Sequence, residues 1–148
     1  RSSAASDVYK RQAGVHLRNQ TVLLRGVNDD VAVLGTLLRK LTAIGVDPYY
    51  IFQCRPVKGI RKMFQVPLTE AVQIVDRAKN VQNGIGKSVR FVMSHPRGKI
   101  EILGKAADDA LLFKFHQAKC TEDAARIFCV KVKPDTIWLD ADLRGDAE

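Results

Sequence analysis

The sequence predicts an α/β fold, in which a parallel sheet covered by helices is followed by a small β-rich appendage. Three short apolar runs alternate with two helical patterns between residues 19 and 93, and this order is typical of parallel sheets. Between about residues 98 and 142, apolar and polar residues alternate instead, as they do in antiparallel hairpins. Two strand–helix repeats are too few to close a barrel, so we expect a portion of one.

The first repeat consists of a β-rich run at residues 19–25, a polar turn and an amphipathic helix. Asp29 or Asp30 can cap the helix, because either carboxylate can accept hydrogen bonds from the first free backbone N–H groups. Apolar residues then recur at helical spacing over residues 31–44, and Gly45 is expected to end the helix.

The second repeat begins with "DPYYIFQC" at residues 47–54, which is an almost continuous apolar run typical of a buried strand. Thr69 is expected to cap a second amphipathic helix, and Gly84 lies beyond the end of that helix. A third strand is expected at residues 88–93. Crossovers between parallel strands of this kind are right-handed.

The last third of the chain contains the alternating segments "GKIEILG", "ALLFKFHQ" and "RIFCVKV". Thr121 is expected to cap a short helix that runs to Ile127. We therefore divide the chain into barrel repeats at residues 13–97 and a β-rich appendage at residues 98–148.

Residues 1–12 differ in composition from the rest of the chain. They lack an initial Met and are rich in Ser, Ala and Arg, but they contain neither the apolar run of a secretory signal nor an amphipathic transit peptide. The segment "DVYKRQ" is encoded by a DNA string that resembles a transposase mosaic-end sequencing adapter. We therefore predict that residues 1–12 are an adapter-derived scar, and that Ala13 lies inside a longer protein. A frayed natural terminus is the alternative.

Composition limits the classes of function. The 148 residues suffice for one domain, and 46% of them are hydrophobic, but no stretch approaches the roughly 20 apolar residues of a membrane span. The net charge is +8, of which residues 1–12 contribute +2 through Arg1, Lys10 and Arg11 against Asp7. The basic residues are scattered, so we expect no nucleic-acid partner and no membrane partner. Three dispersed cysteines form neither a CxxC motif nor a disulfide framework, which predicts reduced thiols and a cytoplasmic location.

Polar residues follow each predicted parallel strand. In α/β barrels ligands bind at the carboxyl ends of the strands, which here points to the segments at residues 25–29, 53–55 and 94–95. Simpler readings stay open at every position. Asn28 can belong only to a turn, Ser94 can belong to a strand-ending turn, and Lys99 can be a solvated surface lysine.

A resemblance takes the interpretation further. The segments "NQTVLLRGVND" and, one helix later, "PYYIFQC" resemble the lysine 2,3-aminomutase family of radical S-adenosylmethionine enzymes. The segments "MSHPRGKIEILG" and "FKFHQAK" resemble its aminomutase-like branch. The resemblance covers about residues 14–140 and implies a partial (β/α)6 radical-SAM barrel.

The resemblance also implies cofactors and a reaction. Members of this family are isomerases that move an amino group to the adjacent carbon of a small amino acid, using a [4Fe–4S] cluster, S-adenosylmethionine and pyridoxal 5′-phosphate (PLP). The family holds its cluster with a CxxxCxxC motif, which this chain lacks. We therefore expect the chain to be inactive alone and the full-length protein to be a homo-oligomer.

Three candidate cofactor residues follow from the resemblance. Gln20 falls on the family's strand glutamine that contacts S-adenosylmethionine, and Asn28 lies where the chain passes the nucleoside. Lys99 is the candidate for the catalytic lysine that binds PLP. The family pattern before that lysine is Asp-Ala-Pro and four glycines, whereas residues 94–99 read Ser-His-Pro-Arg-Gly-Lys, which is two residues shorter.

The expected substrate-binding residues differ from those of lysine-specific members. Those members place aspartates where this chain has Arg55 and Ser94. A guanidinium repels a lysine ammonium but matches a carboxylate, so we predict a substrate other than lysine, such as glutamate or another anionic amine. Alternatively, Arg55 points to solvent and other residues specify the substrate.

Two other functions remain open at this point. One is a radical-SAM enzyme with the same scaffold but different chemistry and no PLP. The other is a non-catalytic basic binding domain.

Overall fold

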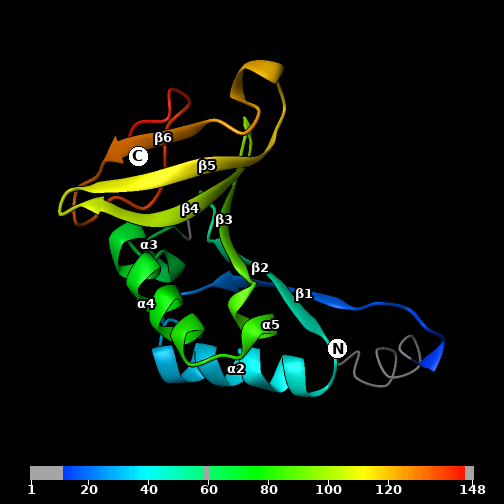
Figure 1. Cartoon of the computed structure of the whole chain (residues 1–148). Coiled ribbons are helices and arrows are strands. Elements are labelled where there is room, and N and C mark those ends of the chain that lie inside the picture. The colour runs from blue at the N-terminus through cyan, green and yellow to red at the C-terminus, as the bar shows by residue number, and fades with distance from the viewer. Residues whose placement is uncertain (1–11, 59–60, 146–148) are drawn as a thin grey trace.

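The computed structural model describes residues 12–58 and 61–145 (Figure 1). Its strands form one six-stranded sheet in the order β1-β2-β3-β4-β5-β6, which confirms an α/β fold. The strands are β1 (Arg18–Leu23), β2 (Asp47–Gln53), β3 (Arg90–His95), β4 (Gly98–Ala107), β5 (Ala110–Ala118) and β6 (Ile127–Lys131). The helices are α2 (Val31–Ala43), α3 (Arg61–Phe64), α4 (Leu68–Asn80), α5 (Gly84–Lys87) and the 3₁₀ turn η1 (Thr121–Asp123). Residues 1–11 of the predicted scar lie outside the described residues.

The sheet changes its pairing sense at the β3–β4 turn. Strand β2 pairs in parallel with both β1 and β3, whereas β3–β4, β4–β5 and β5–β6 are antiparallel pairs. The turn lies at the boundary predicted between residues 97 and 98. The antiparallel strands nevertheless continue the same sheet. That the parallel half belongs to a (β/α)6 barrel stays a prediction.

Helix α2 begins as the sequence indicates. The side chain of Asp30 accepts hydrogen bonds from the N–H groups of Ala32 and Val33, at 2.8 and 3.1 Å, and so caps the helix. Asp29 instead accepts from the N–H of Gly26 and belongs to the preceding turn. Gly45 follows the helix with a φ of 78°, the left-handed conformation that favours glycine.

Two predicted helix caps are wrong. Helix α4 begins at Leu68 after Pro67, so Thr69 lies inside the helix and makes no cap. Thr121 begins the 3₁₀ turn η1, in which no side chain caps the start, and the helix does not continue to Ile127. Ala125 adopts a φ of 58°, which interrupts the helix, and Ile127 already begins β6.

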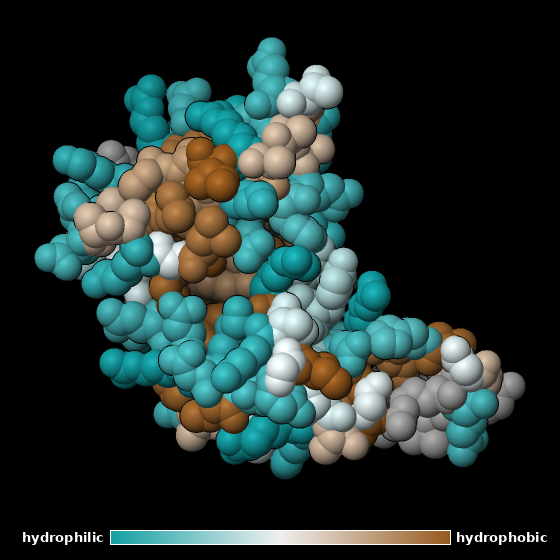
Figure 2. All heavy atoms as spheres, viewed as in Figure 1, coloured by the Kyte–Doolittle hydropathy of each residue, from teal (hydrophilic) through white to brown (hydrophobic). Residues whose placement is uncertain are grey.

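The helices cover one face of the parallel strands. Figure 1 shows α2, α4 and α5 grouped on the same side of β1–β3. Apolar side chains of α2 and α4 pack there with strand residues in the core, among them Leu34, Leu38, Val75, Ile51 and Met93. The outer surface of the helices is largely hydrophilic (Figure 2). No helix within residues 12–58 and 61–145 is long and apolar enough to cross a membrane.

The opposite face of the sheet, here called the helix-free face, carries a different set of side chains. Gln20 pairs in register with Tyr50, and Tyr50 pairs with Arg90, so these three side chains share a face. Two pleats beyond Arg90, Ser94 pairs with Lys99 on the same face. The strands therefore place Gln20 and Lys99 on one side of the sheet, away from the helices.

Candidate functional site

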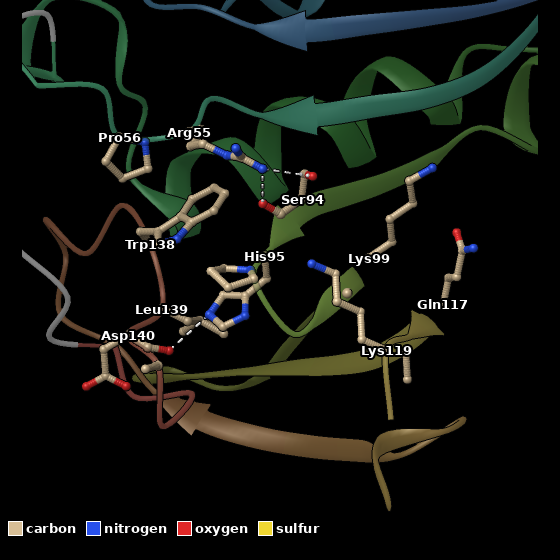
Figure 3. Close-up of a pocket in the computed structure, with 14 residues that line it drawn as sticks. Arg55, Pro56, Ser94, His95, Lys99, Gln117, Lys119, Trp138, Leu139 and Asp140 are labelled. Atoms are coloured by element: carbon tan, nitrogen blue, oxygen red, sulfur yellow. Dashed lines mark hydrogen bonds between the residues drawn. The ribbon is translucent and has the colours of Figure 1, made fainter. Parts of the chain in front are cut away.

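A cavity of about 910 Å³ opens at one edge of the sheet (Figure 3). Its walls come from the segments after β2, at the β3–β4 turn, at the end of β5, and near residues 138–141. The lining residues include Arg55, Ser94, His95, Lys99, Lys119 and Trp138.

The topology explains why these segments meet. Strands β2 and β3 are parallel, so their carboxyl ends lie at the same edge of the sheet. Strand β4 runs in the opposite direction and therefore begins at that edge, and β5 returns to it, with Gly98 opposite Ala118. The start of an antiparallel strand thus joins the ends of two parallel strands.

Arg55 and Ser94 lie in direct contact. The Nη2 group of Arg55 donates to the backbone oxygen of Ser94 at 2.9 Å and to its hydroxyl at 3.1 Å (Figure 3). These bonds turn the guanidinium toward the end of β3 while Arg55 stays exposed at the cavity wall. Within the described residues, Arg55 makes no ion pair with a carboxylate, so its remaining N–H groups are available to a ligand.

Lys99 is the second residue of β4 and is half-buried. Its Nζ atom lies 4.9 Å from the centre of the Tyr50 ring, on the helix-free face. No hydrogen bond or ion pair joins this amine to another of the described residues. The ring contact orients the side chain without occupying any of its three N–H donors.

His95 has a structural position in the cavity wall. Its buried ring accepts a hydrogen bond from the N–H of Arg97 at Nδ1, at 3.1 Å, and its Nε2 lies 3.0 Å from the backbone oxygen of Asp140. Accepting at Nδ1 leaves Nε2 as the protonated nitrogen of a neutral ring. The ring also stacks on Trp138, with the ring centres 6.4 Å apart. His95 therefore attaches the C-terminal segment to the end of β3.

The two other predicted cofactor residues do not line the cavity. Gln20 is exposed on the helix-free face of β1. Asn28 uses both ends of its amide within its own turn: its Oδ1 accepts from the N–H of Leu24 at 2.7 Å, and its Nδ2 donates to the oxygen of Val22 at 2.9 Å. This local bonding is the simpler reading that the sequence left open for Asn28.

The cysteines lie apart from one another. All three are free thiols, and burial raises the pKa of Cys54 at the end of β2. Within the described residues, no group of three His, Cys, Asp or Glu side chains is placed to hold a metal ion.

The structure adds residues that sequence reasoning missed. Lys119 extends from the end of β5 among the cavity residues, and Trp138, the only tryptophan, forms part of the wall (Figure 3). The signal for Lys119 was its place two positions after the predicted strand "ALLFKFHQ". No local pattern marks Trp138, which reaches the site only through the fold of the last residues.

The charge of the cavity is predominantly positive. Arg55, Lys99 and Lys119 each bring a cation. The one lining carboxylate, Asp140, accepts hydrogen bonds from the N–H groups of Asp142 and Arg144, at 2.9 and 2.8 Å, and so stabilises its own turn. The arrangement suits a ligand with at least one anionic group.

Comparison with known proteins identifies relatives. No family model matches the chain. It is 42% identical over 130 residues to a putative L-lysine 2,3-aminomutase of Aquifex aeolicus, covering 88% of this chain and 34% of that protein. It is 42% identical over 86 residues to the L-lysine 2,3-aminomutase of Clostridium subterminale, and 37% identical over 86 residues to the glutamate 2,3-aminomutase of Clostridioides difficile. Each of these two matches covers 58% of this chain and 20% of the relative. The chain thus spans between a fifth and about a third of the length of these relatives.

Proposed function

Because this chain is related to the lysine 2,3-aminomutase family over most of its length, we propose that it supplies the substrate end of an amino-acid 2,3-aminomutase. The reaction would move an amino group to the adjacent carbon of a substrate with an anionic side chain. The observation that carries this proposal is the cavity in which Arg55, Ser94 and Lys99 meet.

PLP is a group that these residues fit. The cavity of about 910 Å³ has room for a ligand of that size, and its cations match a phosphate. Lys99 would hold PLP through its amine, while Lys119 or Arg55 would bind an anionic group of the bound ligands. When bound, PLP would supply a conjugated ring that stabilises an unpaired electron beside the migrating nitrogen. The residues of this chain would bind and orient the ligands and exclude water.

The [4Fe–4S] cluster is a group that the described residues do not fit. Cys54, Cys120 and Cys129 lie after β2, before η1 and on β6, and no group of three ligands forms among the described residues. Gln20 and the turn that Asn28 stabilises are proposed to contact S-adenosylmethionine from the helix-free face of the sheet.

Arg55 is proposed to select the substrate. Its guanidinium is fixed by Ser94 through Nη2, which leaves the N–H groups of Nε and Nη1 for a carboxylate. A lysine ammonium in the same place would be repelled by this charge. The relatives include both lysine and glutamate 2,3-aminomutases at similar identity, so overall identity does not distinguish the two substrates.

The test is a comparison of substrates with the full-length protein that contains this sequence, reconstituted with its cofactors. We expect turnover of glutamate and little turnover of lysine. The variant Arg55→Asp should lower kcat/KM for glutamate by about a hundredfold, because attraction between the guanidinium and the substrate carboxylate is replaced by repulsion between two carboxylates. Arg77→Asp, on the exposed surface of α4, is the matched control and should leave both rates unchanged. Rapid turnover of lysine by the unaltered protein would overturn the assignment of an anionic substrate.

A separate measurement distinguishes the proposed aminomutase from a radical-SAM enzyme that has the same scaffold but does not use PLP. The chain is incubated with PLP, reduced with borohydride and digested, and the modified lysine is identified by mass spectrometry. Modification of Lys99 supports the aminomutase. Labelling scattered over surface lysines, with Lys99 unmodified, would favour the alternative chemistry.

A further inference from the structure

Asp123 is a carboxylate with almost no contact with solvent, since its side chain is only 1% exposed. It binds Arg97 through two hydrogen bonds, from Nε at 2.9 Å and from Nη2 at 2.8 Å. Arg126 donates to the same carboxylate at 3.1 Å, and the thiol of Cys120 lies 3.4 Å away. The paired geometry of Arg97 makes it the principal partner.

The pKa of Asp123 is consistent with a carboxylate that is ionised at neutral pH. Burial alone raises it, but the hydrogen bonds from Arg97, Cys120 and Arg126 outweigh burial and hold the pKa below its ordinary value. The pair is therefore an intact ion pair at neutral pH.

Arg97 also contacts three residues of the cavity wall, two of them through its backbone. Its N–H donates to Nδ1 of His95, and its oxygen accepts from the N–H of Lys119 at 3.1 Å. Its Nη1 lies 3.5 Å from the oxygen of Ala141. The ends of β3 and β5 and the C-terminal segment thus all meet at this one residue.

The next residue, Gly98, connects this position to Lys99. Gly98 has a φ of 137°, and a Cβ atom there would lie 2.2 Å from the backbone oxygen of Gln117. The backbone between Arg97 and Lys99 is therefore closely packed against β5. Fixing Arg97 fixes the point from which the Lys99 side chain extends.

We propose that Arg97 and Asp123 are a positioning pair that holds the β3–β4 turn and so fixes the place of Lys99 in the cavity wall. The inference rests on the proposed function of Lys99 as the PLP lysine. The pair accounts for a turn with a single glycine in place of a glycine-rich segment, because an ion pair with a buried carboxylate fixes the backbone that glycines would leave flexible.

The experiment measures where PLP attaches in the folded 148-residue chain. Borohydride-trapped PLP is quantified at Lys99 and at Lys119, and the ratio of the two yields is compared among variants. Arg97→Met and Asp123→Asn should lower the Lys99:Lys119 ratio by about tenfold, because small misplacements of a reacting group cost large factors in rate. Arg97→Lys keeps the charge but loses the paired donors and should give an intermediate ratio.

Arg126→Gln is the matched control. It removes another partner of Asp123, but Arg126 is 47% exposed and leaves the Arg97 contact in place, so the ratio should stay within about twofold of the wild-type value. Circular dichroism at the labelling temperature verifies that each variant is folded. In folded protein, a general loss of stability would not lower the PLP yield at one of the two lysines alone, so it would not change the Lys99:Lys119 ratio.

The outcomes are distinguishable. Equal ratios in the wild type, Arg97→Met and Arg97→Lys would overturn the positioning role while leaving Lys99 as the PLP lysine. An unmodified Lys99 in the wild-type chain would overturn the proposed function, and the inference with it. If Arg97→Met or Asp123→Asn does not fold, the Lys99:Lys119 ratio of Arg97→Lys is compared with that of the wild type instead. Asp123 keeps a cationic partner in Arg97→Lys.

Discussion

The Nζ atom of Lys99 lies over the ring of Tyr50, 4.9 Å from its centre. Tyr50 is itself buried and packs edge-on against His116, with ring centres 5.7 Å apart. The aromatic face thus supports the lysine side chain by a cation–π interaction while its hydrogen-bond donors remain available.

This contact predicts an energetic coupling between the two residues. In a double-mutant cycle with Tyr50→Leu and Lys99→Met, we expect a coupling of about 0.5–1 kcal/mol in the free energy of unfolding, measured by urea titration. Repeating the cycle with Tyr50→Phe should give almost no coupling, since the ring is kept. A coupling near zero with Tyr50→Leu would mean that the ring does not stabilise the ammonium.

The ionisation of Tyr50 gives a second prediction. Burial, together with a hydrogen bond to Tyr49, raises the pKa of Tyr50 to about 12. The same hydrogen bond lowers the pKa of Tyr49. An alkaline titration followed by phenolate absorbance should therefore resolve one late transition that disappears in Tyr50→Phe. If the late transition persists in that variant, it belongs to another tyrosine.

Acid stability should depend on Asp123. Because its pKa in the folded protein is below the ordinary 3.8, its ionisation stabilises the fold above that pH, and this contribution is lost as the pH falls through the folded-state pKa. The urea midpoint of unfolding should therefore be higher for the wild type than for Asp123→Asn at neutral pH. The two midpoints should converge in strong acid. A constant difference at every pH would contradict a role for the carboxylate charge.

Gly98 should tolerate no side chain. Gly98→Ala would combine an unfavourable φ with a collision against Gln117, and we expect a loss of about 2–4 kcal/mol in the free energy of unfolding. Gly84→Ala, at the start of α5, meets no atom within 4 Å and should change stability by less than about 1 kcal/mol. The two urea curves, recorded side by side, test the prediction.

Much of the fold could be predicted because its signals are local. Apolar spacing indicated α2 and α4, alternation indicated β4 and β5, and the cap at Asp30 follows from its place before an apolar run. The two wrong caps have different causes. Helix α4 begins two residues earlier than a cap at Thr69 would place it, after a proline, whereas at Thr121 the Arg97–Asp123 contact and the φ of Ala125 shape the turn instead.

The candidate site was only partly accessible from sequence. Strand-end reasoning identified Arg55 and Ser94, and the family resemblance identified Lys99; all three line one cavity in the structure. Lys119 and Trp138 were missed, because they enter the cavity through the return of β5 and the path of the last residues. Such contacts depend on long-range packing and leave no periodic pattern in the sequence.

The change of pairing sense at β3 has a consequence for the order of assembly. Strands β4 and β5 are joined by a tight turn, whereas the β1–β2 and β2–β3 pairs form only after whole helices have been placed between them. Local pairings of the first kind form faster than distant ones. In pulse-labelling hydrogen exchange during refolding, the amides of β4 and β5 should become protected before those of β1. Lys99 would then be placed early, because it lies on β4, one of the first two strands to pair. Arg55 would come close to Lys99 only after β2 has joined the sheet.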